Sequence, residues 1–194
     1  MDGPVASNVI GHDPKTKRYP RDPKKAKELL AKAGYPNGLE VKLYLSPDRY
    51  PKAREVCQVI ADQLSQAGVK TELVSQEFIV FWGQEGVNGG KLPFYYVGRP
   101  AIDADTLYDQ YFRSGVTKRL QYKNPEFDRL MDQQQQTGDM KKRIALMQEA
   151  GRILMEDAPM VPLYTLAEIY GVANNVIWKP KPGERVLAAE MKIK

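Results

Sequence analysis

Cysteine and histidine each occur only once among the 194 residues of this chain. Cys57 alone cannot form an intramolecular disulfide, and Cys57 and His12 together supply too few ligands for a zinc site. His12 is the only histidine that could act as the base of a Ser-His-Asp or Cys-His arrangement, and it lies in an irregular stretch between Gly11 and Pro14. We therefore expect no enzymatic activity, no metal ion and no cofactor.

Long apolar runs are also missing. No stretch approaches the length that crosses a bilayer, so the chain is not expected to span a membrane. The first residues, MDGP, lack the basic start and apolar core of a signal peptide.

The net charge of +5 is unevenly distributed, with a cluster of lysines and arginines between Lys15 and Lys32. Only Tyr19 interleaves an aromatic ring with this cluster, and no nucleic-acid-binding motif accompanies it. A solvated helix face with an adjoining loop explains the cluster better than a nucleic-acid site, so we expect no nucleic-acid partner.

A strand–helix–strand pattern follows the basic cluster. A helix begins at the capping residue Asp22 and stops at Gly34. Apolar and polar residues then alternate over 39–45 and again over 69–75, and they flank a helical pattern that starts near Pro51. This order predicts two parallel strands joined by a right-handed crossover helix.

The rest of the chain gives a less uniform pattern. Residues 77–87 fit either a short helix or a packed loop, whereas residues 92–97 predict a third strand. The expected later helices cover 105–112, 125–135 and 139–157, and strand-like pieces cover 160–165, 168–172, 176–178 and 185–188.

Five separated blocks of sequence are more specific than these patterns. They are YPRDPKKAKELL (19–30), AGYPNG (33–38), IADQL (60–64), NPEFD (124–128) and EDAPMVPLY (156–164). In this order they resemble the C-terminal part of the peptide/nickel class, family 5, of extracytoplasmic solute-binding proteins that serve ABC transporters.

The resemblance implies an α/β fold of the periplasmic-binding-protein type II class, present as a single C-terminal lobe with a βαβ core and a mixed sheet. It divides the chain into an extended approach segment (1–21), the lobe (22–173) and a tail (174–194) that would return to an N-terminal lobe. Without that lobe, the tail of an excised lobe would pair with a second copy of the chain or remain without partners.

The implied function is capture of a peptide or related small solute in a cleft between two lobes, followed by delivery to an ABC permease. The implied location is periplasmic or extracytoplasmic, with a signal peptide in the full-length protein. A signalling or regulatory domain that senses a ligand with the same lobe is the alternative.

Ligands of such lobes approach the loops at the carboxyl ends of parallel strands. The candidate ligand-binding residues in those loops are Ser46, Tyr50, Tyr95, Gly98, Arg99 and Asp103. Tyr95 and Tyr96 point to opposite faces of their strand, so at most one should reach the cleft. Asp103 has a second interpretation, as the cap of the helix that follows it.

One of these loops departs from the pattern of peptide-binding family members, which typically place an aspartate after an aromatic residue to pair with the free amine of the peptide. Here the residues that follow Tyr96 are VGRPAID, with no acid before Asp103. Arg99 instead offers a planar cation. The sequence therefore favours a ligand that lacks a free amine or carries an anion.

Overall fold

The computed structural model describes residues 1, 3–181 and 186–194, and it divides the chain into two compact units. The sheet unit comprises Arg18–Gly98 and Asp109–Asp128. The helical unit comprises Met1–Lys17, Arg99–Tyr108 and Arg129–Lys194.

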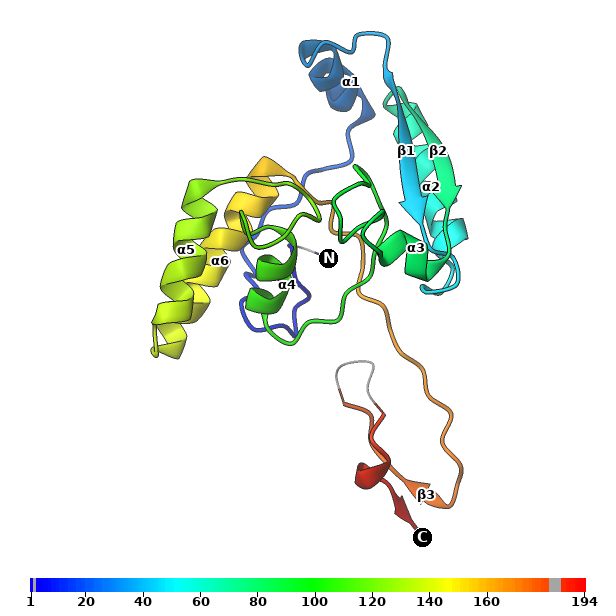
Figure 1. Ribbon diagram of the computed structural model, residues 1–194, viewed down its shortest axis with the longest axis vertical. Helices are drawn as coiled ribbons and strands as arrows, with labels where there is room; N and C mark the ends of the chain where they lie inside the picture. The colour runs from blue at the N-terminus through cyan, green and yellow to red at the C-terminus, as the bar shows by residue number, and fades with distance from the viewer. Residues whose placement is uncertain (2, 182–185) are drawn as a thin grey trace. The chain divides into compact units, whose positions relative to one another are not determined.

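The sheet unit is built on a βαβ motif. Strands β1 (Leu39–Leu45) and β2 (Val69–Ser75) pair in parallel from Leu39↔Val69 to Leu45↔Ser75. Helix α2 (Ala53–Gln66) connects them and packs against both strands (Figure 1). The predicted strand–helix–strand unit is confirmed, with both strands at the predicted residues.

Apolar residues at fixed spacing bury one face of α2 against the strands. Ala53, Cys57 and Ala61 recur every four residues and are buried, so they lie on one side of the helix. They share a core with Leu43 and Leu45 of β1. Burial raises the pKa of the Cys57 thiol to about 11 because the thiolate would lose its hydration there.

Helix α1 (Pro23–Lys32) has the predicted ends. A carboxylate oxygen of Asp22 accepts a hydrogen bond from the backbone N–H of Lys25 at 2.9 Å, and Gly34 follows with φ +94°. No residue of α1 is buried. The basic residues of this helix therefore occupy an exposed surface, as the charge pattern predicted.

The predicted third strand is reduced to a single bridge. Tyr95 forms a parallel bridge with Tyr44, supported by hydrogen bonds from Tyr44 N to Phe94 O and from Tyr96 N to Tyr44 O. No other residue of 92–97 forms a bridge or strand, so the prediction of a full strand over 92–97 is wrong. The ambiguous segment before it forms a short helix, α3 (Phe78–Trp82), in which Phe81 is buried.

Three further helices carry buried faces. Helix α4 (Ala104–Tyr111) begins in the helical unit, α5 (Pro125–Gln136) ends in it, and α6 (Met140–Asp157) lies wholly inside it. Their bounds fall within one residue of those predicted. On α6, the buried residues are Met147, Ala150, Gly151 and Leu154, which follow helical spacing.

Residues 3–15 contain several bends and turns and belong to the helical unit. Val5 and Val9 are buried, and Asp13 is 7% exposed. Asp13 accepts hydrogen bonds from the backbone of Lys15 at 2.9 Å and from Arg152 at 2.5 Å, and these interactions lower its pKa. The three-part division at residues 21 and 173 stays a prediction.

The end of the chain contains little regular structure. Residues 160–165 and 168–172 form no strand, so those predictions are wrong. β3 (Val176–Ile177), within the predicted piece 176–178, pairs antiparallel with β4 (Lys192–Ile193), which follows the 3-10 turn η1 (Ala188–Glu190). Arg185 lies outside the described residues, and Val186 and Leu187 are not in a strand.

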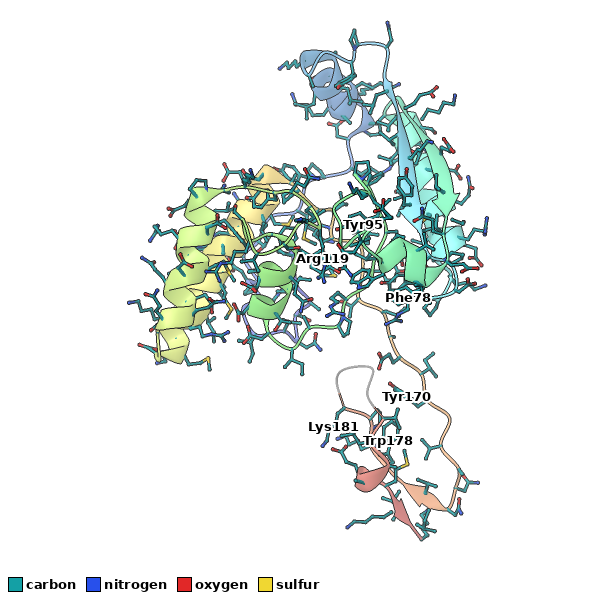
Figure 2. All side chains as sticks on the ribbon, viewed as in Figure 1. Phe78, Tyr95, Arg119, Tyr170, Trp178 and Lys181 are labelled. Carbon is teal, nitrogen blue, oxygen red and sulfur yellow. The ribbon has the colours of Figure 1, made fainter. Side chains whose placement is uncertain are left out.

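The alternating apolar residues after Pro159 predicted strands because alternation is the usual mark of a half-buried strand. In the structure these side chains remain exposed, and Ile169 is the extreme case at 95%. The rings of Tyr170 and Trp178 meet edge-to-face, with centroids 5.2 Å apart (Figure 2). Pairing of the tail with another lobe or a second copy stays a prediction.

Candidate functional site

The loop after β1 contains the first two predicted ligand residues, and the structure buries both. Ser46 is fully buried, and its Oγ has no hydrogen-bond partner among the residues described. Tyr50 is 7% exposed and meets Tyr96 edge-to-face with ring centroids 5.8 Å apart. Tyr50 therefore helps to form the core at the carboxyl end of β1.

Gly98 lies against the same tyrosine. A Cβ atom at this position would approach the Tyr50 ring to 3.3 Å, so glycine permits the close contact between the two loops. The structure thus brings together Tyr50 and Gly98, which are far apart in sequence.

Tyr95 and Tyr96 face opposite sides, as predicted. Tyr96 is buried beside Tyr50, whereas Tyr95 is half-buried and packs edge-to-face on Phe81 at 6.3 Å. Figure 2 shows Tyr95 close to Arg119, whose backbone carbonyl accepts a hydrogen bond from the Tyr95 hydroxyl at 3.3 Å. Burial raises the pKa of Tyr95, so this hydroxyl remains a proton donor at neutral pH.

Arg99 and Asp103 belong to the helical unit. The Arg99 side chain is exposed. Asp103 accepts hydrogen bonds from the Arg143 guanidinium at 2.6 and 3.2 Å, and its Oδ1 also accepts one from the backbone N–H of Asp105 at 3.0 Å. The carboxylate therefore caps α4 and binds Arg143, which supports the capping interpretation of Asp103 more than a ligand contact.

An aromatic and cationic stack follows the strand ends, and the sequence interpretation did not include it. The Arg49 guanidinium lies 5.2 Å from the Tyr50 ring centroid and 5.8 Å from that of Phe78. Phe78 in turn stacks on Trp82, with centroids 6.1 Å apart and planes 18° apart. This places a cation from the loop after β1 against the helix that follows β2.

The stack continues to Arg119, which lies 5.2 Å from the Trp82 ring centroid and 5.1 Å from that of Tyr111. We name the residues Arg49, Phe78, Trp82 and Arg119 the arginine–aromatic stack. Arginine on aromatic faces combines cation–π attraction with flat packing. The sequence signal that could have revealed the stack is the dense aromatic content of residues 78–82, but its arginine partners are distant in sequence.

The described residues contain no group of three or more His, Cys, Asp or Glu side chains that could hold a metal ion. His12 lies in the helical unit, where its Nδ1 is 3.2 Å from the carbonyl oxygen of Val5. Among the helices of the described ranges, none has the length and apolar content needed to cross a bilayer.

Comparison with known proteins identifies the class to which this fold belongs. A family model for the middle part of bacterial extracellular solute-binding proteins of family 5 matches residues 1–119. Among solved structures, the periplasmic binding protein DppA from Helicobacter pylori, in complex with the peptide STSA, is similar with a TM-score of 0.73 and 29% identity. That similarity covers 84% of this chain and 32% of DppA.

Two curated relatives have similar coverage. The glutathione-binding protein GsiB of Pectobacterium atrosepticum is 30% identical over 84% of this chain and 34% of its own length. The heme-binding protein A of Haemophilus influenzae is 26% identical over 82% of this chain and 30% of its own length. The chain thus spans about a third of the length of these relatives.

The fold is that of a lobe of a type II periplasmic binding protein. The chain belongs to family 5 of the bacterial extracellular solute-binding proteins. The resemblance in its sequence blocks and the α/β fold class are therefore confirmed.

Proposed function

We propose that this chain forms one lobe of the substrate-binding component of an ABC importer for peptides or related small solutes. The lobe would supply one wall of a cleft, capture the solute without altering it, and present it to a membrane permease. The observation that carries this proposal is the family match over residues 1–119, because it includes the βαβ core and the loops after its strands.

The ligands named for the relatives support a small organic solute. They include glutathione, heme and the peptide STSA, which differ in size and shape. Family membership therefore leaves the solute open among these classes. The absence of an acid between Tyr96 and Asp103 favours a solute recognised through an anion instead of a free amine.

The cellular location of the protein and the ligand contacts supplied by a second lobe form part of the same proposal. We infer that the whole protein acts outside the cytoplasmic membrane and is exported by a signal peptide. The residues described here would then provide only part of the ligand contacts, so affinity would depend on a second lobe.

The proposal can be tested on the longest protein encoded by the reading frame. In a thermal-shift screen with peptides, glutathione, opines, sugars and metal complexes, one solute class should raise the melting temperature of the protein. A ligand present at a hundred times its Kd stabilises the protein by about 2.7 kcal/mol, which such a screen detects readily. The proposal would be contradicted if the protein chemically altered a solute while no compound in the screen stabilised it.

A further inference from the structure

Arg119 carries a positive charge that no carboxylate balances in the part of the chain that the structure describes. Its Nε donates to Asn88 Oδ1 at 3.0 Å, and its Nη1 lies 3.3 Å from both the backbone and side-chain oxygens of Gln110. All three acceptors are neutral oxygens. The guanidinium is therefore held in place while its charge stays uncompensated.

The remaining donors of this guanidinium are on one nitrogen. Arginine has five N–H groups, of which Nε and Nη1 account for three. Nη2, with the other two, has no hydrogen-bond partner within the described ranges. The residue is half-buried, so part of its surface remains accessible to solvent.

The surroundings strengthen any interaction with an anion. Two aromatic rings, those of Trp82 and Tyr111, lie within 5.2 Å of the guanidinium carbon and replace water near it. A cation in such low-dielectric surroundings attracts an anion more strongly than a fully hydrated one does. An arginine kept there without a counter-ion is therefore ready for an anionic ligand.

The position of Arg119 connects it to the expected ligand edge of the sheet unit. Through Trp82 and Phe78, the arginine–aromatic stack leads to Arg49 in the loop after β1. Helix α3, which contributes both aromatic rings, follows the carboxyl end of β2. Ligands of parallel sheets approach this edge.

We propose that Nη2 of Arg119 binds a carboxylate of the transported solute. A single guanidinium nitrogen with two donors matches a group with one negative charge, whereas a phosphate dianion would require further donors or a second cation. This assignment rests on the proposed function and names the chemical group by which the solute is recognised.

The experiment uses the intrinsic fluorescence of Trp82, one of two tryptophans in the chain. In a Trp178→Phe background, the chain is titrated at constant ionic strength with acetate, the tetrapeptide Ser-Thr-Ser-Ala, the C-terminal amide of that tetrapeptide, and inorganic phosphate. Acetate and the free-acid peptide should give a saturable change, and the amide should not.

Asn88→Asp is the decisive variant. It keeps an oxygen acceptor for Nε, so the guanidinium stays in place, but it supplies the missing negative charge. Carboxylate binding should then weaken by about 10- to 100-fold, the usual effect of losing a charged hydrogen bond. Arg119→Ala should give the same loss, and Arg54→Ala, which removes an exposed arginine bound to Ser75, should leave the titration unchanged.

Three results would overturn the assignment. They are no saturable response to acetate or the free-acid peptide, equal binding by Asn88→Asp and the unmodified chain, and tighter binding of phosphate than of acetate. Because Asn88→Asp keeps the bracing contacts of Arg119, a purely structural role predicts no loss in that variant. If the longer protein binds its solute equally well with Arg119→Ala, this inference fails while the proposed function stands.

Discussion

The carboxylate of Asp103 makes the sharpest prediction about stability, because two separate interactions converge on it. Asp103 and Arg143 have 24% and 19% of their side-chain surfaces exposed, and two hydrogen bonds of 2.6 and 3.2 Å join them. The same carboxylate caps α4 through the backbone N–H of Asp105. Replacing it removes an ion pair and a helix cap together.

The expected cost of Asp103→Ala follows from these two parts. Loss of an N-cap destabilises by about 0.5–2 kcal/mol. Loss of a hydrogen-bonded charge pair adds about 1.5–3 kcal/mol, which is appropriate here because both side chains are mostly buried. We expect a decrease of about 2–5 kcal/mol in the free energy of unfolding.

Companion variants separate the two parts. Asp103→Asn keeps a capping oxygen and loses the charge, and Arg143→Ala loses the pair and keeps the cap, so both should cost less than Asp103→Ala. The double variant of Asp103 and Arg143 should show a coupling energy of about 0.5–3 kcal/mol. Glu40→Gln is the matched control, because its pair with Lys70 has 74% and 78% of the side chains exposed and should not shift the midpoint.

Urea unfolding followed by far-UV circular dichroism measures these differences. With a slope of about 2 kcal/mol per molar, a loss of about 2–5 kcal/mol should lower the midpoint for Asp103→Ala by about 1–2.5 M. An unchanged midpoint, or zero coupling with Arg143, would refute the structural role. If solute binding were then lost as well, Asp103 would return to the set of ligand residues.

Three further predictions concern single positions. The pKa of Cys57 is about 11 in the folded chain and 9.0 in the unfolded chain. Between pH 9 and 11 the thiol therefore ionises first in the unfolded chain, and the free energy of unfolding falls as pH rises. Cys57→Ala should flatten this dependence when urea unfolding is measured as a function of pH. Gly38→Ala should destabilise more than Gly34→Ala, because both have positive φ but only the former would place Cβ 2.1 Å from a backbone oxygen, that of Gly68; equal melting temperatures would contradict this. Asp139→Ala should cost about 0.5–2 kcal/mol, since Asp139 accepts from two backbone N–H groups at the start of α6, and an unchanged denaturation midpoint would argue against the cap.

The βαβ core could be predicted from sequence because local patterns and chain connections agree there. Alternation over β1 and β2 identifies the buried face, and Gly68, with φ +88°, supplies the tight turn that separates α2 from β2. Each choice concerns neighbouring residues only. For the same reason, the cap Asp22 was found at its correct position.

The tail could not be predicted in this way because strand formation depends on a distant partner. An alternating pattern states which side chains would be buried if a strand formed, but backbone pairing requires another strand alongside it. Residues 160–172 have the pattern and no such neighbour among the residues described. Their exposed apolar side chains, Val161, Leu163 and Ile169 among them, are the consequence.

Prediction of the site was limited by what a loop position alone reveals. The topology indicated the two loops in which Tyr50 and Gly98 lie, yet it could not indicate that these two residues would pack against each other. Whether a loop side chain faces solvent depends on its rotamer and on its neighbours, neither of which leaves a periodic signal. Arg119 is the clearest case, since its contacts come from Asn88, Gln110 and Trp82.

This distribution of contacts bears on how one lobe could serve solutes as different as those of its relatives. Tyr50, Tyr96 and Gly98 pack tightly. Substitutions at these positions would therefore disturb the core before they changed the ligand specificity. Arg119, in contrast, is fixed by neutral oxygens and aromatic faces, and changing one neighbour such as Asn88 alters its charge balance while leaving the βαβ core intact. Under the proposed role of Arg119, solute specificity can change at the periphery of the stack without a cost to the fold, provided that Nη2 keeps its two donors for the solute.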